Sequence, residues 1–179
     1  MSRKKINRLR ERFKKGMATS FKKINSSIET DSFLYNEDIE GSIAHAEMLA
    51  KQKIISPSES TKIIRGLKKI KSEIKSNKFI FSDELEDIHL NIETRLFELI
   101  GETAGKLHTA RSRNDQVITD LKIWIKNSTN EINNNINKII KTTIKLAEKN
   151  IETIMPGFTH LKNAQAISFA HYLMSYVEM

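Results

Sequence analysis

The feature that most restricts the fold is an uninterrupted run from about Asp115 to Asn150 that contains neither Pro nor Gly. Apolar side chains recur along it at roughly helical spacing: Val117, Leu121, Ile125, Ile132, Ile136, Ile139 and Ile140. At 1.5 Å per residue such a helix is on the order of 50 Å long. A helix of this length without internal caps indicates a bundle or coiled coil. We therefore expect partner helices from later sequence, from other subunits, or from both.

Three shorter helices are predicted before it. The first runs from about 36 to 53, and the second starts at a capping box formed by Ser56 and Glu59. The third starts near Ser82 and stops at Gly101. The apolar stripes of these helices are Ile39, Ile43, Ala46 and Ala50; Ile63, Leu67, Ile70 and Ile74; and Leu85, Ile88, Ile92, Leu96 and Leu99.

The rest of the chain shows almost none of the alternation of apolar and polar residues that is typical of β-strands. Residues 79–81 are the only short strand candidate, and residues 102–114 indicate an ordered loop or a helix entrance. Pro156 and Gly157 end the long helix, and a largely apolar helix is predicted from about 163 to 179. A chain that ends inside an apolar helix is expected to be a fragment. The predicted fold class is all-α.

The net charge of +8 is concentrated in residues 1–23, which hold ten Lys or Arg residues and a single acid, Glu11. Three interpretations stay open: a solvated tail, a phosphate-binding arm that makes the chain a basic nucleic-acid-binding helical module, and a transit peptide. The absence of Cys excludes disulfides and thiolate catalysis and is consistent with a reducing cytosol. The sequence shows neither a membrane span nor a secretory signal, so we expect a cytoplasmic protein.

Residues 105–116, Gly-Lys-Leu-His-Thr-Ala-Arg-Ser-Arg-Asn-Asp-Gln, are unusually rich in polar and cationic side chains. They place cations, hydroxyls and amides at the entrance of the long helix. Free N–H groups at a helix N-terminus bind carboxylates, and Arg adds bidentate recognition. An ordinary N-cap with a basic turn is the alternative.

Two further segments carry titratable groups. Residues 155–161, Met-Pro-Gly-Phe-Thr-His-Leu, put a hydroxyl and an imidazole on a constrained turn, where His160 is a candidate acid or base or a structural residue. In residues 87–89, Asp-Ile-His, His89 lies four residues before Glu93 on the same helix face, so the two can pair. A surface ion pair of little energetic weight is the alternative. No two histidines show His-x-x-x-His spacing, so neither a metal nor another cofactor is predicted.

Taken together, these three segments resemble the argininosuccinate lyase family of the fumarase and aspartase superfamily, which includes the delta-crystallins. Residues 106–116 match its first signature region almost residue for residue, and 155–161 match its second. Residues 38–46, 87–89 and 176–179 match as well. The resemblance is to the N-terminal portion of the family and covers almost the whole chain after the basic arm.

The resemblance implies elimination of fumarate from argininosuccinate to give arginine. By position, His160 is the residue of proton transfer, as base, acid or orienting group. The residues implied to bind substrate are Ser27, Asp31, Asp87, His89, Ser112, Arg113, Asn114 and Thr159. The family is a homotetramer whose active sites take residues from three subunits. We thus expect a basic arm over 1–23, an N-terminal helical domain over 24–104, and the first long helices of a central bundle over 105–179.

This chain departs from the family at several positions. Only Arg12 and Phe13 match its usual Trp-Gly-Gly-Arg-Phe, Ala110 replaces a common Gly, and Lys162 and Ala166 replace the usual Gln and Pro. The family's loop with the catalytic serine lies beyond Met179, so the isolated chain is expected to be inactive. A catalytically idle structural relative is the alternative to an enzyme.

Overall fold

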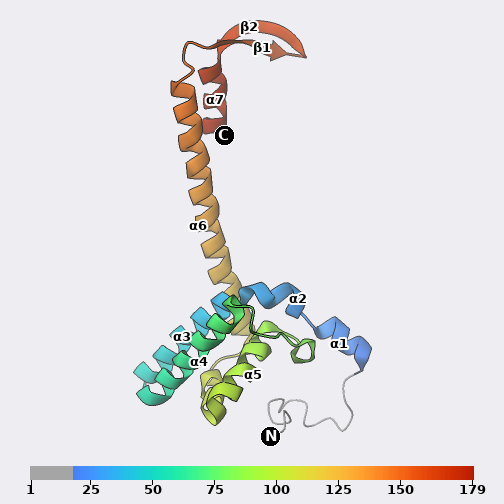
Figure 1. Ribbon diagram of the computed structural model, residues 1–179, viewed down its shortest axis with the longest axis vertical. Helices are drawn as coiled ribbons and strands as arrows, with labels where there is room; N and C mark the ends of the chain where they lie inside the picture. The colour runs from blue at the N-terminus through green and yellow to red at the C-terminus, as the bar shows by residue number, and fades with distance from the viewer. Residues whose placement is uncertain (1–17) are drawn as a thin grey trace. The chain divides into compact units, whose positions relative to one another are not determined.

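The computed structural model describes residues 18–179, which are mainly helical (Figure 1). The elements, in chain order, are α1 (Thr19–Asn25), α2 (Ile28–Asp31), the 3₁₀ helix η2 (Ser32–Leu34), α3 (Tyr35–Lys51), α4 (Pro57–Lys75), η3 (Asp83–Leu85), α5 (Ile88–Ile100), η4 (Gly101–His108), α6 (Arg113–Glu148), β1 (Ile154–Thr159), β2 (Lys162–Ser168) and α7 (Phe169–Glu178). The predicted all-α class is confirmed, with one small two-stranded sheet among the described residues.

The chain divides into two compact units, Met1–Trp124 and Ile125–Met179, with the division inside α6. Most of the predicted basic arm lies outside the described residues. Its last part, residues 19–23, belongs to α1. No helix in the described part of the chain has both the length and the apolar character needed to cross a membrane.

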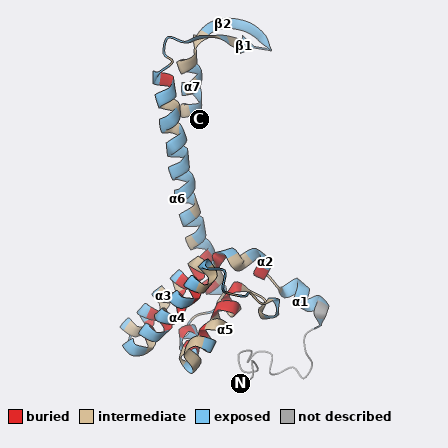
Figure 2. Ribbon diagram, viewed as in Figure 1, coloured by how far each residue is buried: buried red, intermediate tan, exposed pale blue. Residues whose placement is uncertain are grey.

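The core of the first unit lies among α3, α4, α5 and η4, where buried positions concentrate (Figure 2). The predicted stripes are confirmed at their centres, because the following side chains are buried: Ile39, Ala46, Ile63, Leu67, Ile70, Ile88, Ile92 and Leu96. Apolar burial of this kind contributes about 1.5–3 kcal/mol for each large aliphatic side chain.

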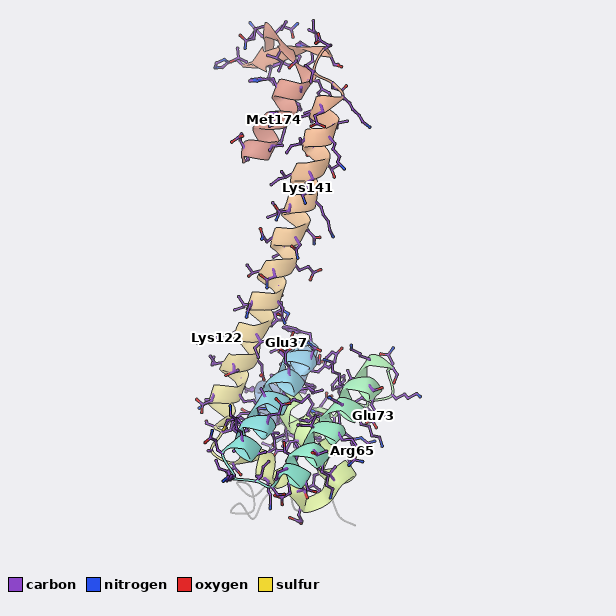
Figure 3. The ribbon with its side chains drawn as sticks, turned by 90° about the vertical axis from the view of Figure 1, so that its left-hand side faces the viewer. Glu37, Arg65, Glu73, Lys122, Lys141 and Met174 are labelled. Carbon is purple, nitrogen blue, oxygen red and sulfur yellow. The ribbon has the colours of Figure 1, made fainter. Side chains whose placement is uncertain are left out.

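Local signals explain where α4 and α5 begin and end. Both bonds of the predicted Ser56 and Glu59 capping box are present at the start of α4. Gly101 ends α5 with a φ of 68°, as predicted. The two helices are also joined by a bidentate ion pair, because Arg95 of α5 donates to both carboxylate oxygens of Glu73 at 2.9 Å (Figure 3, where Glu73 is labelled on α4).

The predicted start of the third helix is wrong. Residues 83–85 form only the short η3, and Glu86 then takes a φ of 68°, which ends helical geometry. The helix α5 begins at Ile88 because Asp87 caps it, its carboxylate accepting from the Leu90 N–H at 2.6 Å. Residues 79–81 are not a strand; the Phe79 and Phe81 rings pack with centroids 5.0 Å apart.

The long helix is confirmed as α6, within two residues of the predicted bounds. Its second half carries exposed apolar side chains, with Ile132 60 %, Ile136 49 % and Ile139 66 % exposed. Lys141 marks this half in Figure 3. Within the second unit, the described residues leave this predicted stripe uncovered.

The helix predicted over 163–179 is wrong in its first third. Residues 162–168 form β2, which pairs antiparallel with β1 in a hairpin, and α7 starts only at Phe169. A two-residue turn of His160 and Leu161 joins the strands, with φ of 50° and 62°. Gly157 lies at the bulge of β1, where a Cβ atom would come within 3.1 Å of the Gln165 carbonyl oxygen. Strand pairing therefore overrides the helical pattern of residues 163–168.

Candidate functional site

The start of α6 presents the predicted carboxylate-binding residues. The Ser112 hydroxyl accepts from the Asn114 N–H at 3.2 Å, and the Ser112 N–H donates to the Asp115 carboxylate at 3.3 Å. Ser112 and Asn114 are exposed. Because the first N–H groups of a long helix lack intrahelical partners, this end can bind an anion.

Arg113 connects this helix start to α5. Its guanidinium donates to Glu93 at 2.9 Å and to the side-chain oxygen of Gln116 at 2.7 Å, and its Nε lies 4.0 Å from the Asp87 carboxylate. The predicted pairing of Glu93 with His89 is therefore wrong. Glu93 faces Arg113, and His89 points into the interior.

Ser27 and Asp31 are held against the beginning of α5. The Ser27 hydroxyl donates to Asp31 at 2.7 Å, and the other Asp31 oxygen accepts from the Ile88 N–H at 3.1 Å. The backbone N–H groups of Ser27 and Ile28 both donate to the Glu86 carbonyl, at 2.8 and 3.1 Å. Two segments far apart in the sequence thus form one hydrogen-bonded unit.

Asp87 completes this group of carboxyl residues near Asp31. Burial raises the pKa of Asp31 and the negative charge of Asp87 adds to that rise, while hydrogen bonds from Ser27 and Ile88 oppose it. The structure therefore brings Ser27, Asp31, Asp87 and His89 together around one helix end, and Arg113 joins it to α6.

A buried polar cluster lies behind this surface. His89, 2 % exposed, has its Nδ1 at 2.9 Å from Asp38 of α3 and at 3.5 Å from Asp120 of α6. The amide of Gln116 also donates to Asp38. Arg111 donates to the Ser42 hydroxyl at 2.9 Å and contributes positive charge near both aspartates.

Burial and charge set the protonation of this cluster. Burial and then the negative charge of Asp38 raise the pKa of Asp120 to about 7. Burial opposes ionisation of Asp38 and His89 too, but their mutual hydrogen bond and attraction outweigh it, lowering the pKa of Asp38 and raising that of His89. The cluster therefore favours the protonated form of His89 and of Asp120 and the ionised form of Asp38.

Sequence reasoning missed Asp38, Gln116 and Asp120 as parts of the site. Asp38 and Gln116 lie within the segments that carry the family resemblance, which was a usable signal. Asp120 shares a helix face with Gln116 at a spacing of four residues, but only the packing of α6 against α3 and α5 shows that this face is buried.

The same three side chains have the geometry of a possible metal site. Asp38, His89 and Asp120 each offer one ligand atom, and these atoms lie within 4.8 Å of one another. However, the Nδ1 atom that would bind a metal already faces both carboxylates, and Arg111 adds positive charge beside them. A hydrogen-bonded ion cluster explains these contacts without a metal, and the absence of a metal or cofactor stays a prediction.

A hollow of about 240 Å³ lies beside Arg111 and Asp120. Its other lining residues are Gly41, His45, Ala110, Asp115, Gln116 and Thr119. The hollow borders the loop that leads to Ser112. The loop itself is held by the Thr109 carbonyl, which lies 2.9 Å from the Nε2 of His45.

Thr159 and His160 lie in the second unit, at the tip of the hairpin. The Thr159 hydroxyl lies 3.0 Å from the Nδ1 of His160, and both side chains are exposed. Positive φ at a residue other than Gly costs free energy, on the order of 1–3 kcal/mol, and such strain often marks a functional position. Of the residues predicted to form the site, Thr159 and His160 thus contact each other.

Polar and cationic groups at a helix start suit a carboxylate ligand. The family model described as a lyase matches residues 11–179. The chain belongs to this lyase family.

Relatives of known name are similar over most of this chain. The argininosuccinate lyase of Pelagibacter ubique is 65 % identical over 168 residues, which are 94 % of this chain and 36 % of the relative. The argininosuccinate lyase of Ehrlichia chaffeensis is 53 % identical over the same shares. The chain thus spans about a third of the length of the curated relatives it matches.

Solved structures agree in fold. A variant of EDDS lyase with bound fumarate is 27 % identical with a TM-score of 0.68, over 82 % of this chain and 28 % of that chain. A fumarate lyase from Mesorhizobium, at 18 % identity and a TM-score of 0.65, covers 89 % of this chain and 36 % of that chain. The second likeness shows the fold alone.

Proposed function

We propose that this chain is the N-terminal portion of an argininosuccinate lyase, a carbon–nitrogen lyase of arginine biosynthesis. The reaction removes a proton from the carbon next to a carboxylate of argininosuccinate. The carbanion then expels the guanidinium nitrogen, releasing arginine and leaving fumarate. Negative charge grows on that carboxylate in the transition state, so donors preorganised around it accelerate the step.

The observation that carries this proposal is the start of α6. Ser112 and Asn114 present exposed polar side chains at this helix start, and Arg113 is held beside them by Glu93 and Gln116. We assign these three residues to a substrate carboxylate. The identity to argininosuccinate lyases over 94 % of the chain supports that substrate over other fumarate-releasing ones.

The remaining assignments follow the family resemblance. Ser27, Asp31 and Asp87 contact substrate. The resemblance assigns His89 to substrate as well, although its ring is buried behind them. Thr159 holds substrate, and His160 acts in proton transfer. The complete protein is a cytoplasmic homotetramer that needs no cofactor, and neither nucleic acid nor a membrane is a partner.

Fumarate release from argininosuccinate, followed by ultraviolet absorbance, tests the proposal. The 179-residue chain is compared with a version extended by the downstream sequence of the Pelagibacter ubique relative, and with that version carrying His160→Asn. Asn tolerates positive φ, so this variant keeps the hairpin while losing the imidazole.

We expect release by the extended chain only, reduced on the order of 10²-fold or more by His160→Asn. A folded extended chain that releases no fumarate contradicts the enzyme and favours a catalytically idle structural relative. Release by the 179 residues alone contradicts the expectation that a downstream serine is required.

A further inference from the structure

The buried cluster of Asp38, His89 and Asp120 contains polar atoms that lack a hydrogen-bond partner. Among the described residues of this cluster, these atoms are the Oδ2 of Asp38 and the Oδ2 of Asp120, and the Nε of the neighbouring Arg111 also has no partner. The two aspartates are 1 % and 2 % exposed. A buried charge destabilises the fold unless opposite charges compensate it. We therefore expect this cluster to have a role other than stability.

One imidazole joins three helices in this cluster. His89 belongs to α5, Asp38 to α3 and Asp120 to α6, and the His89 Nδ1 lies 2.9 and 3.5 Å from the two carboxylates. Because one ring atom of α5 faces carboxylates from two other helices, α5 has little freedom to rotate about its axis. The cluster thus fixes the orientation of the beginning of α5.

That beginning of α5 carries the contacts that hold the predicted substrate residues. Ile88, next to His89, donates its N–H to Asp31 at 3.1 Å. Glu86 accepts the backbone N–H groups of Ser27 and Ile28. A rotation of α5 would therefore displace Ser27 directly.

Arg113 transmits the same constraint to the other substrate segment. It donates to Glu93, one helical turn after His89 on α5, and follows Ser112 at the start of α6. Asp120 lies two turns further along α6, so this helix contacts α5 at two levels. The positions of both segments assigned to substrate, Ser27 and the start of α6, therefore depend on the His89 ring.

We propose that Asp38 and Asp120 are positioning residues, which clamp His89 between α3 and α6 and so hold Ser27 and the start of α6 in place for substrate. This role rests on the proposed function, since it concerns the same site. His89 in this view acts through the helix that it anchors, because its ring is buried. Neither aspartate needs to touch substrate.

The first test uses the 179-residue chain and requires no activity. Nuclear magnetic resonance follows the His89 ring between pH 5 and 9, and hydrogen exchange follows the amides of Ser27 and Ile28. The variants are Asp38→Asn and the milder Asp120→Asn. Glu131→Gln, an exposed carboxylate of α6, is the matched control.

We expect Asp38→Asn to lower the His89 titration midpoint by about one pH unit or more, since an opposite charge at this distance shifts a pKa by that amount. The amides of Ser27 and Ile28 should exchange about tenfold faster in both variants. The increase should exceed that at Leu67 of α4, which is in the core and reports global unfolding.

Three results would overturn the proposal. One is equal acceleration at Leu67 and Ser27, which would mean a loss of stability alone. Another is unchanged exchange at Ser27 in a folded variant. The third is paramagnetic broadening of the His89 ring signals by added Mn²⁺, which would make the cluster a metal site.

A second test measures kinetics in the extended enzyme. We expect Asp120→Asn to raise KM for argininosuccinate about tenfold, with a smaller change in kcat, because loosened substrate contacts weaken binding. A KM within twofold of the parent contradicts the role. If the extended parent releases no fumarate, the proposed function fails, while the exchange of Ser27 and Ile28 still decides the clamp.

Discussion

Ala110 has a φ of 56° between η4 and α6, in the left-handed region that favours glycine. The argininosuccinate lyase resemblance places Gly in many members at this position. The backbone geometry explains that preference. A side chain there costs about 1–2 kcal/mol, although Gly in turn loses more entropy on folding.

We therefore expect Ala110→Gly to stabilise the first unit by up to about 1 kcal/mol. Urea denaturation followed by circular dichroism measures the change. Ala44→Gly is the matched control, because Ala44 is exposed within α3 and the same substitution there costs about 1 kcal/mol. Equal destabilisation by both variants would contradict the strain at Ala110.

Asp120 predicts how stability depends on pH. Its pKa in the folded state is raised to about 7, from an ordinary value of 3.8 in the unfolded chain. The folded state therefore binds more protons between these values, and stability falls as pH rises from about 4 to 7. His89, whose pKa is also raised, stabilises the fold below about 6.5 and loses this contribution as pH rises through its folded pKa.

Asp120→Asn cannot ionise, so its free energy of unfolding should fall less steeply between about pH 4 and 7 than that of the parent. Denaturation at several pH values tests this, with Glu131→Gln as the control whose curve should follow the parent. Parallel curves for Asp120→Asn and the parent would mean that Asp120 titrates normally in the fold. Asp38, with its lowered pKa, acts in the opposite direction, since its stabilisation is lost as pH falls below about 4.

At the scale of elements, helix ends were predictable where their signals are local. Ser56 caps α4, which begins at the next residue, and Gly101 ends α5, which stops at the residue before it. Asp87 also caps locally, but Asp83 and Glu84 gave an equally good first-turn signal a few residues earlier. The choice depends on Glu86, whose backbone is fixed by bonds to Ser27 and Ile28.

The hairpin was not predictable from periodicity, because its geometry depends on pairing between β1 and β2. The usual signal for a two-residue turn is Asn-Gly, and this turn is His160 and Leu161. The sequence predicts His160 on a constrained turn that carries functional groups, but not on a turn between two paired strands. Similarly, the burial of His89 depends on Asp38 and Asp120, which lie on two other helices.

The contact between α4 and α5 depends on the absence of a side chain at Gly66. A Cβ atom there would lie 2.5 Å from the Cδ1 of Leu96, whose side chain is fully buried and cannot swing away. We expect Gly66→Ala to destabilise the first unit by about 1–3 kcal/mol through overpacking, despite the better helix propensity of Ala. Urea denaturation measures this change.

Gly105→Ala is the appropriate comparison, because a Cβ atom at Gly105 meets nothing within 4 Å. It should leave stability unchanged or slightly raised. If Gly66→Ala proves as stable as Gly105→Ala, α4 and α5 are able to separate slightly, and the close packing is not a constraint on the fold.

At the scale of the whole molecule, we expect further helices to cover the second half of α6. Ile132, Ile136 and Ile139 form a stripe at helical spacing and are about half exposed or more. Burial of one such side chain contributes about 1.5–3 kcal/mol. This stripe is therefore a suitable contact for the helices of the proposed tetramer.

Replacing Ile132, Ile136 and Ile139 by Lys in the extended chain should convert tetramers to smaller species, measured by light scattering during size exclusion. Helical content should persist, because these side chains support no contact within the described residues. The matched control places Lys at Asn130, Asn134 and Asn137, which are exposed, have the same spacing and occupy the opposite face of α6. If both triple variants dissociate equally, added charge is the cause. If neither dissociates, the subunits meet elsewhere and the stripe is covered by the extended chain's own helices.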